Sequence, residues 1–361
     1  MSKGTVEHLA KLRGTPAVSI LCPLDAHRPG NLHDSAVLKG LRDRAEEQVR
    51  AAPSGQAASS MISRIDEALS ALDLEHPTPG VAIFVSPDLS RVIRLDYPVD
   101  PEVLVGERFA IRGLLKALQQ RPSARVVVLS QAKTRCIDLN GDHASQRLDF
   151  GFALEVQPPV EADTPHRDFP LSEHEHAEAA KFVVRAVDRA LDGLQHRDAR
   201  PLVLLGAERD LACFDEIASQ PAHVIGHLHG DYERESADAI AELVRPVLDT
   251  HQLEHEQQAC AAAREAIGSH AVAGIIDTWR AARAGCGHQL LVEDEFRYPA
   301  RVVVDALERA SDDHPGAFDA VEDTVEEVVR HGGDVLVVSR DSLADVGRIV
   351  LVTRYSSEGN S

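Results

Sequence analysis

The stretch HQLEH, from His251 to His255, fits the H-x-x-E-H pattern of zinc peptidases, in which two histidines one helical turn apart bind the metal. The apolar stripe of the same predicted helix runs from Leu253 to Ile267. Both histidines lie across the helix from Leu253, so we expect them to face solvent. We interpret the stretch as a solvated helix face and keep a zinc-dependent hydrolase using His251, Glu254 and His255 as the weaker alternative.

Two further stretches place histidines beside acidic residues. In GHLHGD, from Gly226 to Asp231, the two histidines and the aspartate could ligate a metal, but no complementary ligand cluster is identifiable. We interpret this segment as a polar loop between glycines. In EADTPHRDFPLSEHEH, from Glu161 to His176, Ser172 and Glu175 form an S-x-x-E capping box that predicts the start of a helix. His174 and His176 would then point in nearly opposite directions, which weakens a shared metal site.

The sequence contains no G-x-S-x-G, G-x-G-x-x-G or Walker-type loop, and it offers no convincing catalytic constellation. Its five cysteines are widely spaced and contain no C-x-x-C, which indicates neither a disulfide framework nor a cysteine zinc site. We therefore predict a protein of the reducing cytoplasm that is not an enzyme and binds no cofactor.

The composition is that of a folded protein with a negative electrostatic field. Of the 361 residues, 43% are hydrophobic and 27% charged, and the formal net charge is −20. Such a field repels phosphates and argues against general attraction to nucleic acid. From Gly106 to Arg147, however, eight basic residues stand against three acids, which predicts a local basic face. No run approaches the roughly 18 apolar residues of a membrane helix, so no membrane partner is expected.

The elements that must position these residues alternate between strands and helices. AVSILCPL predicts a buried strand, and GVAIFVS and RVIRLDYPV predict a hairpin around PDLS. ERFAIRGLLKALQQR predicts a helix that ends at Pro122. ARVVVLSQAKTRCIDLNGD predicts a second strand pair, and an apolar stripe from Ala180 to Leu194 predicts an amphipathic helix. RPLVLLGAERDLACFDEIA then indicates a buried strand followed by a helix.

The last third predicts a compact αβα sandwich. A long helix near Asp249 precedes strand HQLLVED, helix AVEDTVEEVVRHGG and strands DVLVVS and GRIVLVTRY, with Gly332 and Gly333 at the helix C-cap. We predict a mixed α/β (α+β) protein with a divergent N-terminal domain over residues 1–120, a middle domain over 121–250 and a C-terminal domain over 251–361.

Five segments in order resemble the bacterial branch of the archaeo-eukaryotic peptide-release-factor family, relatives of Pelota and of the hibernation factor Balon. They are GVAIFVSPDLSRVIRL, RVVVLSQAKTRCIDL, KFVVRAVDRAL, PLVLLGAERDLACFDEIA and HGGDVLVVSRDSLADVGRIVLVTRY. The resemblance implies a ribonuclease-H-like middle domain and a C-terminal domain like those of ribosomal kink-turn-binding proteins. It also implies ribosome binding, through ribosomal RNA, tRNA or ribosomal proteins, and leaves open a translational GTPase as a further partner.

The family's true release factors carry a Gly-Gly-Gln loop before the long middle-domain helix, and here TPHRDFPLS takes its place. Glycine reaches backbone conformations closed to other residues, so this segment cannot substitute for the loop. The resemblance thus implies a ribosome-associated factor of stress, hibernation or rescue that does not hydrolyse peptidyl-tRNA. A protein-interaction module outside translation remains the alternative. The candidates for contact with RNA or a partner are His166, Arg167, Arg125, Lys133, Arg135 and Arg340.

Overall fold

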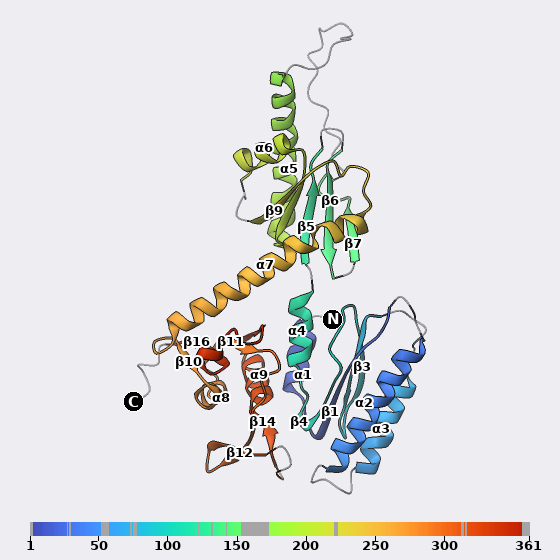
Figure 1. Cartoon of the computed structure of the whole chain (residues 1–361), viewed down its shortest axis with the longest axis vertical. Coiled ribbons are helices and arrows are strands. Elements are labelled where there is room, and N and C mark those ends of the chain that lie inside the picture. Colours follow the sequence, from blue (N-terminus) through green and yellow to red (C-terminus); the bar gives the residue numbers. More distant parts are fainter. Residues whose placement is uncertain are drawn as a thin grey trace. The chain divides into compact units, whose positions relative to one another are not determined.

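The computed structural model describes residues 3–355 apart from 27, 29, 52–57, 73, 75–77, 122, 131–132, 142, 153–172, 220–222, 312–313 and 315. The chain forms two compact units (Figure 1). Unit 1 combines Met1–Gln120 with Glu256–Ser361, and unit 2 is Arg121–His255. The mixed α/β class predicted from the sequence is confirmed, while the division into domains 1–120, 121–250 and 251–361 stays a prediction.

The N-terminal part of unit 1 is an antiparallel sheet in the order β3-β2-β1-β4. Alternating side chains of β1 point to opposite faces, as expected for a strand. Val18 and Ile20 face α2 and α3, whereas Leu21 faces a second core. The elements of this part are α1 (Lys3–Lys11), β1 (Arg13–Pro23), α2 (Leu32–Ala51), α3 (Ala58–Ser70), β2 (Gly80–Val85), β3 (Ser90–Leu95), β4 (Glu102–Arg108) and α4 (Arg112–Gln120).

Two predictions for this part meet different outcomes. The hairpin around PDLS is confirmed, since β2 and β3 pair antiparallel from Val85↔Ser90 to Gly80↔Leu95. The helix predicted to begin at Glu107 begins at Arg112, because Glu107 and Arg108 belong to β4. Strand β4 pairs with β1, about 90 residues earlier in the chain, and no local pattern reveals that pairing.

The C-terminal part of unit 1 is the predicted αβα sandwich. Its sheet has the order β10-β16-β11-β15, with the C-terminal half of α7 on one face and α8 and α9 on the other. A smaller sheet, β13-β12-β14, is inserted between β11 and α9. The elements are α7 (Ala237–Ala266), β10 (Ala271–Ala273), α8 (Ile275–Arg283), β11 (Gly287–Glu293), β12 (Pro299–Val303), β13 (Ala306–Arg309), β14 (Phe318–Asp319), α9 (Ala320–Arg330), β15 (Asp334–Val338) and β16 (Ile349–Thr353).

The two parts of unit 1 share one continuous hydrophobic core. Phe84 and Phe109 of the N-terminal part, whose rings meet edge to face at 5.3 Å between centroids, belong to the same buried cluster as Trp279 and Val325. Gln119 at the end of α4 is bonded to β15, donating to the carbonyl of Val335 and accepting from the amide of Val337. Residues 1–120 and 256–361 therefore bury apolar surface together.

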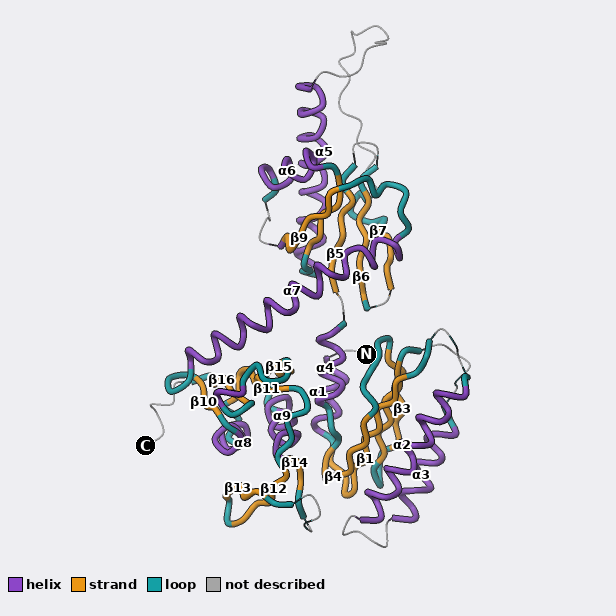
Figure 2. The backbone as a smooth tube through the Cα atoms, viewed as in Figure 1, coloured by secondary structure: helices purple, strands orange, loops and turns teal. Residues whose placement is uncertain are grey.

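Unit 2 is a five-stranded sheet in the order β7-β6-β5-β8-β9. Helices α5 and α6 cover one face, and the first half of α7 packs on the other (Figure 2). Gly226 in β9 permits this packing, because a Cβ there would lie 2.5 Å from the Val247 side chain of α7. The elements are β5 (Ser123–Val128), β6 (Arg135–Asn140), β7 (His143–Arg147), α5 (Glu173–Arg197), β8 (Leu202–Gly206), α6 (Glu208–Ile217) and β9 (Val224–His229).

The strand pair and the strand–helix unit predicted for this region are confirmed by β5–β6 and by β8–α6. The interpretation of GHLHGD as a polar loop is wrong, because His227 and His229 lie in β9 and pair with β8. Long-range pairing with an apolar neighbour outweighs the polar local sequence here. The proposed N-cap, Ser172, lies outside the described residues, and α5 begins at Glu173.

Candidate functional site

The candidate site lies at the carboxyl edge of the unit 2 sheet. Strands β5, β8 and β9 are parallel and end at Val128, Gly206 and His229. Ligands of α/β sheets commonly bind at this edge, where the loops that follow the strands converge. These loops enclose an open cavity of about 280 Å³, lined by Leu129, Ser130, Ala207, Arg209, Asp210, Gly230, Asp231, Tyr232 and Glu233.

Hydrogen bonds tie the loop after β5 to the loop after β9. The Ser130 hydroxyl donates to the Glu233 carboxylate and accepts from the backbone amide of Lys133 at 3.3 Å. Arg135 donates to two carbonyls of the second loop, that of Tyr232 at 2.7 Å and that of Glu235 at 2.9 Å. The cavity wall is therefore built by the chain itself and needs no ligand to hold its shape.

Asp210 is the most buried acid of this edge. It stands in the first turn of α6 and is 9% exposed, and its buried Oδ1 has no hydrogen-bond partner in the part of the chain that the structure describes. The nearest cation is Arg209, whose Nε lies 3.9 Å from that oxygen, beyond hydrogen-bonding distance. A buried carboxylate oxygen without a donor costs free energy, so this geometry favours a donor entering from the cavity.

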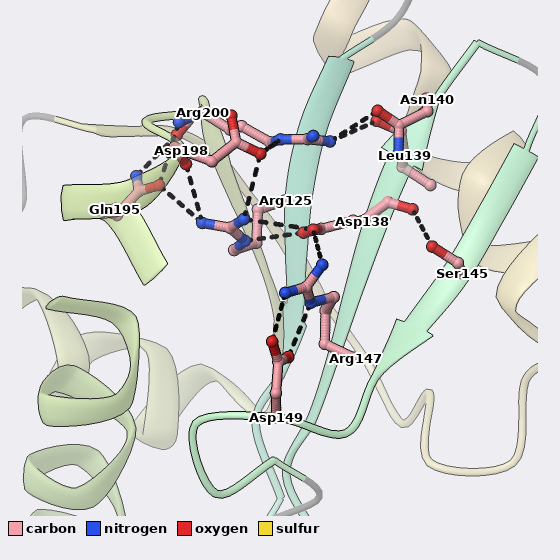
Figure 3. Close-up of polar contacts among 10 residues, drawn as sticks. All are labelled: Arg125, Asp138, Leu139, Asn140, Ser145, Arg147, Asp149, Gln195, Asp198 and Arg200. Atoms are coloured by element: carbon pink, nitrogen blue, oxygen red, sulfur yellow. Dashed lines mark hydrogen bonds and ion pairs between the residues drawn. The ribbon is translucent and has the colours of Figure 1, made fainter. Parts of the chain in front are cut away.

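The sequence pointed to Arg125 as a contact residue, and the structure corrects this. Arg125 is 1% exposed and forms a two-point ion pair with Asp138, with Nε–Oδ1 at 2.7 Å and Nη2–Oδ2 at 3.2 Å (Figure 3). Its Nη1 donates to the side chain of Gln195 at 2.9 Å and to the carbonyl of Asp198 at 3.3 Å. The guanidinium is therefore buried and hydrogen-bonded inside unit 2, where RNA cannot reach it.

The pair belongs to a larger network that ties β5, β6 and β7 to the end of α5. Arg147 lies 3.4 Å from the Asp138 carboxylate and binds Asp149 at 2.5 Å, while Arg200 donates to the side chain of Asn140 at 2.9 Å (Figure 3). Near this network, burial raises the pKa of the Cys136 thiol to about 12, so the thiol stays protonated at neutral pH. These polar residues hold the sheet together.

The beginning of the predicted basic segment Gly106–Arg147 is likewise engaged in internal ion pairs. In unit 1, Arg108 lies 2.8 Å from Glu327 and 3.2 Å from Asp323, and Arg112 lies 2.7 Å from Glu322. These pairs join β4 and α4 of the N-terminal part to α9 of the C-terminal part. The net positive charge of Gly106–Arg147 therefore does not form one exposed surface, because acids distant in the sequence neutralise much of it.

The remaining predicted contact residues divide between the units. Lys133 is exposed beside the cavity, and Arg135 is partly exposed at the same edge of unit 2. Arg340 follows β15 in unit 1, with a side chain 71% exposed and 3.9 Å from the Glu295 carboxylate. His166 and Arg167 lie outside the described residues. The structure thus brings only Lys133 and Arg135, among the described candidates, to the cavity edge.

The zinc alternative gains no support from α7. Glu254 and His255 are exposed and His251 is partly buried, and the described residues hold no group of three or more His, Cys, Asp or Glu placed to bind a metal. Leu253, predicted to lie in the buried stripe, is 49% exposed, since the buried contacts of this end of α7 come from Cys260 and Ala263.

Metal removal gives a direct check on that alternative. We expect purified protein to contain no stoichiometric zinc, and we expect chelation to leave its thermal unfolding unchanged, because two solvent-facing histidines without a third ligand bind zinc weakly. Elemental analysis together with melting curves before and after chelation tests this. Stoichiometric zinc that His255→Ala removes would establish the alternative.

Sequence reasoning missed most of the cavity residues. Ser130 directly follows VVVL, and Asp210 and Glu233 each come four positions after LVLLG and VIGHLH. A residue within a few positions of the end of a parallel strand is the signal that could have found them. Asp231 was weighed only as a metal ligand.

The comparison with protein families covers this same region. Residues 125–285 match the family model of bacterial archaeo-eukaryotic release factor family 3. The resemblance predicted from the sequence is thereby confirmed. The release-factor match begins in β5, includes the cavity edge and all of α7, and ends just after α8.

Solved structures with similar chains include three translation proteins. The archaeal termination factor aRF1 has 16% identity and a TM-score of 0.25, covering 98% of this chain and 99% of that one. Archaeal Pelota, in a model of ribosome-bound Pelota and ABCE1, has 12% identity and a TM-score of 0.44, covering 98% and 94%. Dom34 of S. cerevisiae, described as interacting with Hbs1, has 14% identity and a TM-score of 0.40, covering 76% and 79%. No curated protein matches the chain.

Proposed function

We propose that this protein is a ribosome-associated translation factor of the release-factor and Pelota type that binds the ribosome without hydrolysing peptidyl-tRNA. The observation that carries the proposal is the match of residues 125–285 to a release-factor family. We further propose that it acts in the cytoplasm during stress, hibernation or rescue. Among the described residues, no helix combines the length and apolarity that a membrane span requires.

The glycines of the chain support the absence of peptide release. The only adjacent pair in the sequence is Gly332-Gly333, and Asp334 follows it. Gly332 has φ +75° directly after the C-cap of α9, and a Cβ on Gly333 would lie 2.7 Å from Val328. This pair ends a helix, as glycines at that position commonly do. It is therefore not available as the catalytic loop of a release factor.

The charge distribution supports a proposal for how this factor would contact the ribosome. Arg108, Arg112 and Arg125 are held by internal acids, and the chain carries a net charge of −20. Contact through basic ribosomal proteins, with a few local contacts to RNA such as Lys133, fits this distribution better than a broad RNA-binding surface.

Co-sedimentation on gradients, from growing and from starved cells, tests the proposal. The factor should travel with ribosomal fractions at low salt, in larger amount from starved cells. Its absence from every ribosomal fraction at low salt would overturn the proposal. Capture mainly of non-ribosomal proteins would instead support an interaction module outside translation.

Charge reversal at Lys133 tests the contact with RNA. We expect Lys133→Glu to weaken ribosome binding and to reduce the slope of log affinity against log salt by about 1, since one phosphate contact is lost. Arg189→Glu is the matched control, because Arg189 is exposed on α5 of the same unit and its described hydrogen bond, to the Arg185 carbonyl, stays within its own helix. Equal effects of the two variants would show that only net charge matters. Arg135 is less suited, because its reversal would also release the loop after β9.

A further inference from the structure

We propose that the cavity at the carboxyl edge of the unit 2 sheet binds an organic cation, the ammonium or guanidinium group of a small amine or of a basic side chain. The inference stands on the geometry of unit 2 alone and does not depend on ribosome binding. Four features of the cavity carry it: its charge, an unsatisfied acceptor, its preorganised walls and its size.

The charge of the lining favours a cation. Of the described residues that line the cavity, Asp210, Asp231 and Glu233 are acidic and Arg209 is basic, while Lys133 and Arg135 stand outside the lining at the same edge. The Arg209 side chain is 51% exposed and approaches Asp210 only to 3.9 Å, so solvent screens the attraction and no hydrogen bond forms. An anion would be repelled by the three carboxylates. The α6 N-terminus does not reverse this preference, because Asp210 already supplies the negative charge that a helix start attracts.

Asp210 supplies an acceptor for which the described residues provide no donor. Among them, none donates a hydrogen bond to its Oδ1, although the residue is nine-tenths buried and its side chain forms part of the cavity wall. An entering N–H group would form a charge-assisted hydrogen bond in a partly desolvated place, where such bonds are strong. A protonated amine or a guanidinium provides this donor, whereas a neutral apolar ligand does not.

The second acidic wall is held in position before any ligand arrives. The Ser130 hydroxyl binds the Glu233 carboxylate, and the Asp231 carboxylate accepts from the Glu233 amide at 3.2 Å. Tyr232 is likewise fixed, since its hydroxyl donates to the carbonyl of His229 at 3.1 Å. Preorganised acceptors lower the entropy cost of binding a small cation.

Size and ligand geometry distinguish an organic cation from a metal ion. A volume of about 280 Å³ exceeds what a single ion needs and lies just below the range typical of drug-sized ligands. Within the part of the chain that the structure describes, no three acidic, histidine or cysteine side chains converge on a metal position. Leu129 and Ala207 supply apolar wall for the methylene stem of an arginine, a lysine or a polyamine.

Binding to the purified full-length chain, with no ribosomes present, tests the inference. The probes are an arginine-containing tripeptide with blocked ends, its citrulline counterpart and spermidine. We expect the arginine peptide to bind with millimolar or better affinity, to shift the amide resonances of residues 206–210 and 230–233, and to bind more tightly as salt is lowered. The citrulline peptide, which has nearly the same shape without the charge, should bind at least tenfold more weakly.

Two variants link binding to the cavity. Asp210→Asn should lower the affinity for the arginine peptide roughly tenfold or more, since an ionic acceptor becomes neutral at almost constant shape. Ala207→Leu should block the cavity without removing charge, and it should preserve the fold because both residues are equally poor helix caps. Glu216→Gln is the control, because it makes the same charge change on an exposed position of α6 outside the cavity.

Each outcome has a definite meaning. Binding of spermidine but not of the peptide would assign the site to free amines, and binding of the peptide alone would assign it to the side chain of a protein partner. Equal affinities for arginine and citrulline peptides, no binding by any probe up to about 10 mM, or equal losses in Asp210→Asn and Glu216→Gln would overturn the inference. Because no ribosome takes part, a negative result here leaves the co-sedimentation test unaffected.

Discussion

Replacement of Arg125 by methionine should destabilise unit 2 by about 3–5 kcal/mol, the usual cost of removing one partner from a buried ion pair. The Asp138 carboxylate is 2% exposed and would keep only Arg147, 3.4 Å away and itself shared with Asp149. Gln195 would lose its donor from Arg125 as well. The buried carboxylate would then be left short of donors, which is why the effect is large, whereas Gln195 would keep its bonds with the backbone of Arg200.

Native-state hydrogen exchange measures this change within the intact chain. The opening free energies of amides in β5 and β8 should fall in Arg125→Met. Those of amides in β11 and β16 of unit 1 should remain higher than those of β5 and β8 in the same variant. Arg189→Met is the matched control and should change stability by no more than about 0.5 kcal/mol, because that arginine is exposed.

Replacement of the whole pair sharpens the test. Arg125→Met combined with Asp138→Leu should recover part of the loss, since an apolar pair leaves no buried charge unpaired. If Arg125→Met changes the opening free energy by less than about 1 kcal/mol, the pair is not what stabilises the sheet.

Unit 1 should lose stability as the pH rises from about 5 to about 8, by roughly 3 kcal/mol from Glu322 alone. Burial raises the pKa of the Glu322 carboxyl from the ordinary 4.5 to about 7, against the opposing effect of Arg112, with Glu102 and Asp319 adding to the rise. Burial and the neighbouring Glu322 also raise the pKa of Glu326. Helix α9 places Glu322, Asp323, Glu326 and Glu327 against two arginines, so the acids outnumber the bases.

The sign follows from proton binding. The folded chain holds the Glu322 proton at a pH where the unfolded chain has released it, so this stabilisation is complete below about pH 4.5 and is lost as the pH rises through about 7. Carboxyls whose pKa is lowered by an arginine, such as Asp66 beside Arg42, lose their contribution only at lower pH. The two effects therefore fall in separate pH ranges.

The single tryptophan of the sequence makes this measurable. Trp279 is buried in unit 1 and donates to the Asp323 carboxylate on α9 at 2.7 Å, so its fluorescence reports on unit 1 during urea unfolding. Glu322→Gln should flatten the pH dependence, whereas Glu265→Gln, at an exposed position in the unit 1 part of α7, should leave it unchanged. A pH dependence identical in wild type and Glu322→Gln would contradict the assignment.

The sequence by itself was sufficient for the elements whose signals are local. The apolar runs of β5, β8 and β11, the hairpin around PDLS, the strand pair β5–β6 and the glycines that end α9 all depend on residues close to one another in the sequence. The order of these segments was also sufficient to indicate a resemblance to the release-factor family, and the family-model match over residues 125–285 confirms that resemblance.

One misassigned residue was within reach of the sequence. Arg125 pairs directly opposite Asp138 in the β5–β6 register, so the predicted hairpin already contained the evidence that its charge is satisfied there. The net positive charge of Gly106–Arg147 suggests Arg125 as a contact residue, whereas its guanidinium is covered by Gln195 and the end of α5.

Other features were decided only by the tertiary structure. Arg108 meets Glu327 across more than 200 residues of chain, and the cavity gathers Ser130 and Glu233 from two loops and Asp210 from the first turn of α6. Composition reports how many charges a segment carries but not which of them are paired, because Coulomb energy depends on distance and burial rather than on sequence separation. Folding therefore turned the basic segment largely into internal ion pairs and left an acidic cavity at the sheet edge.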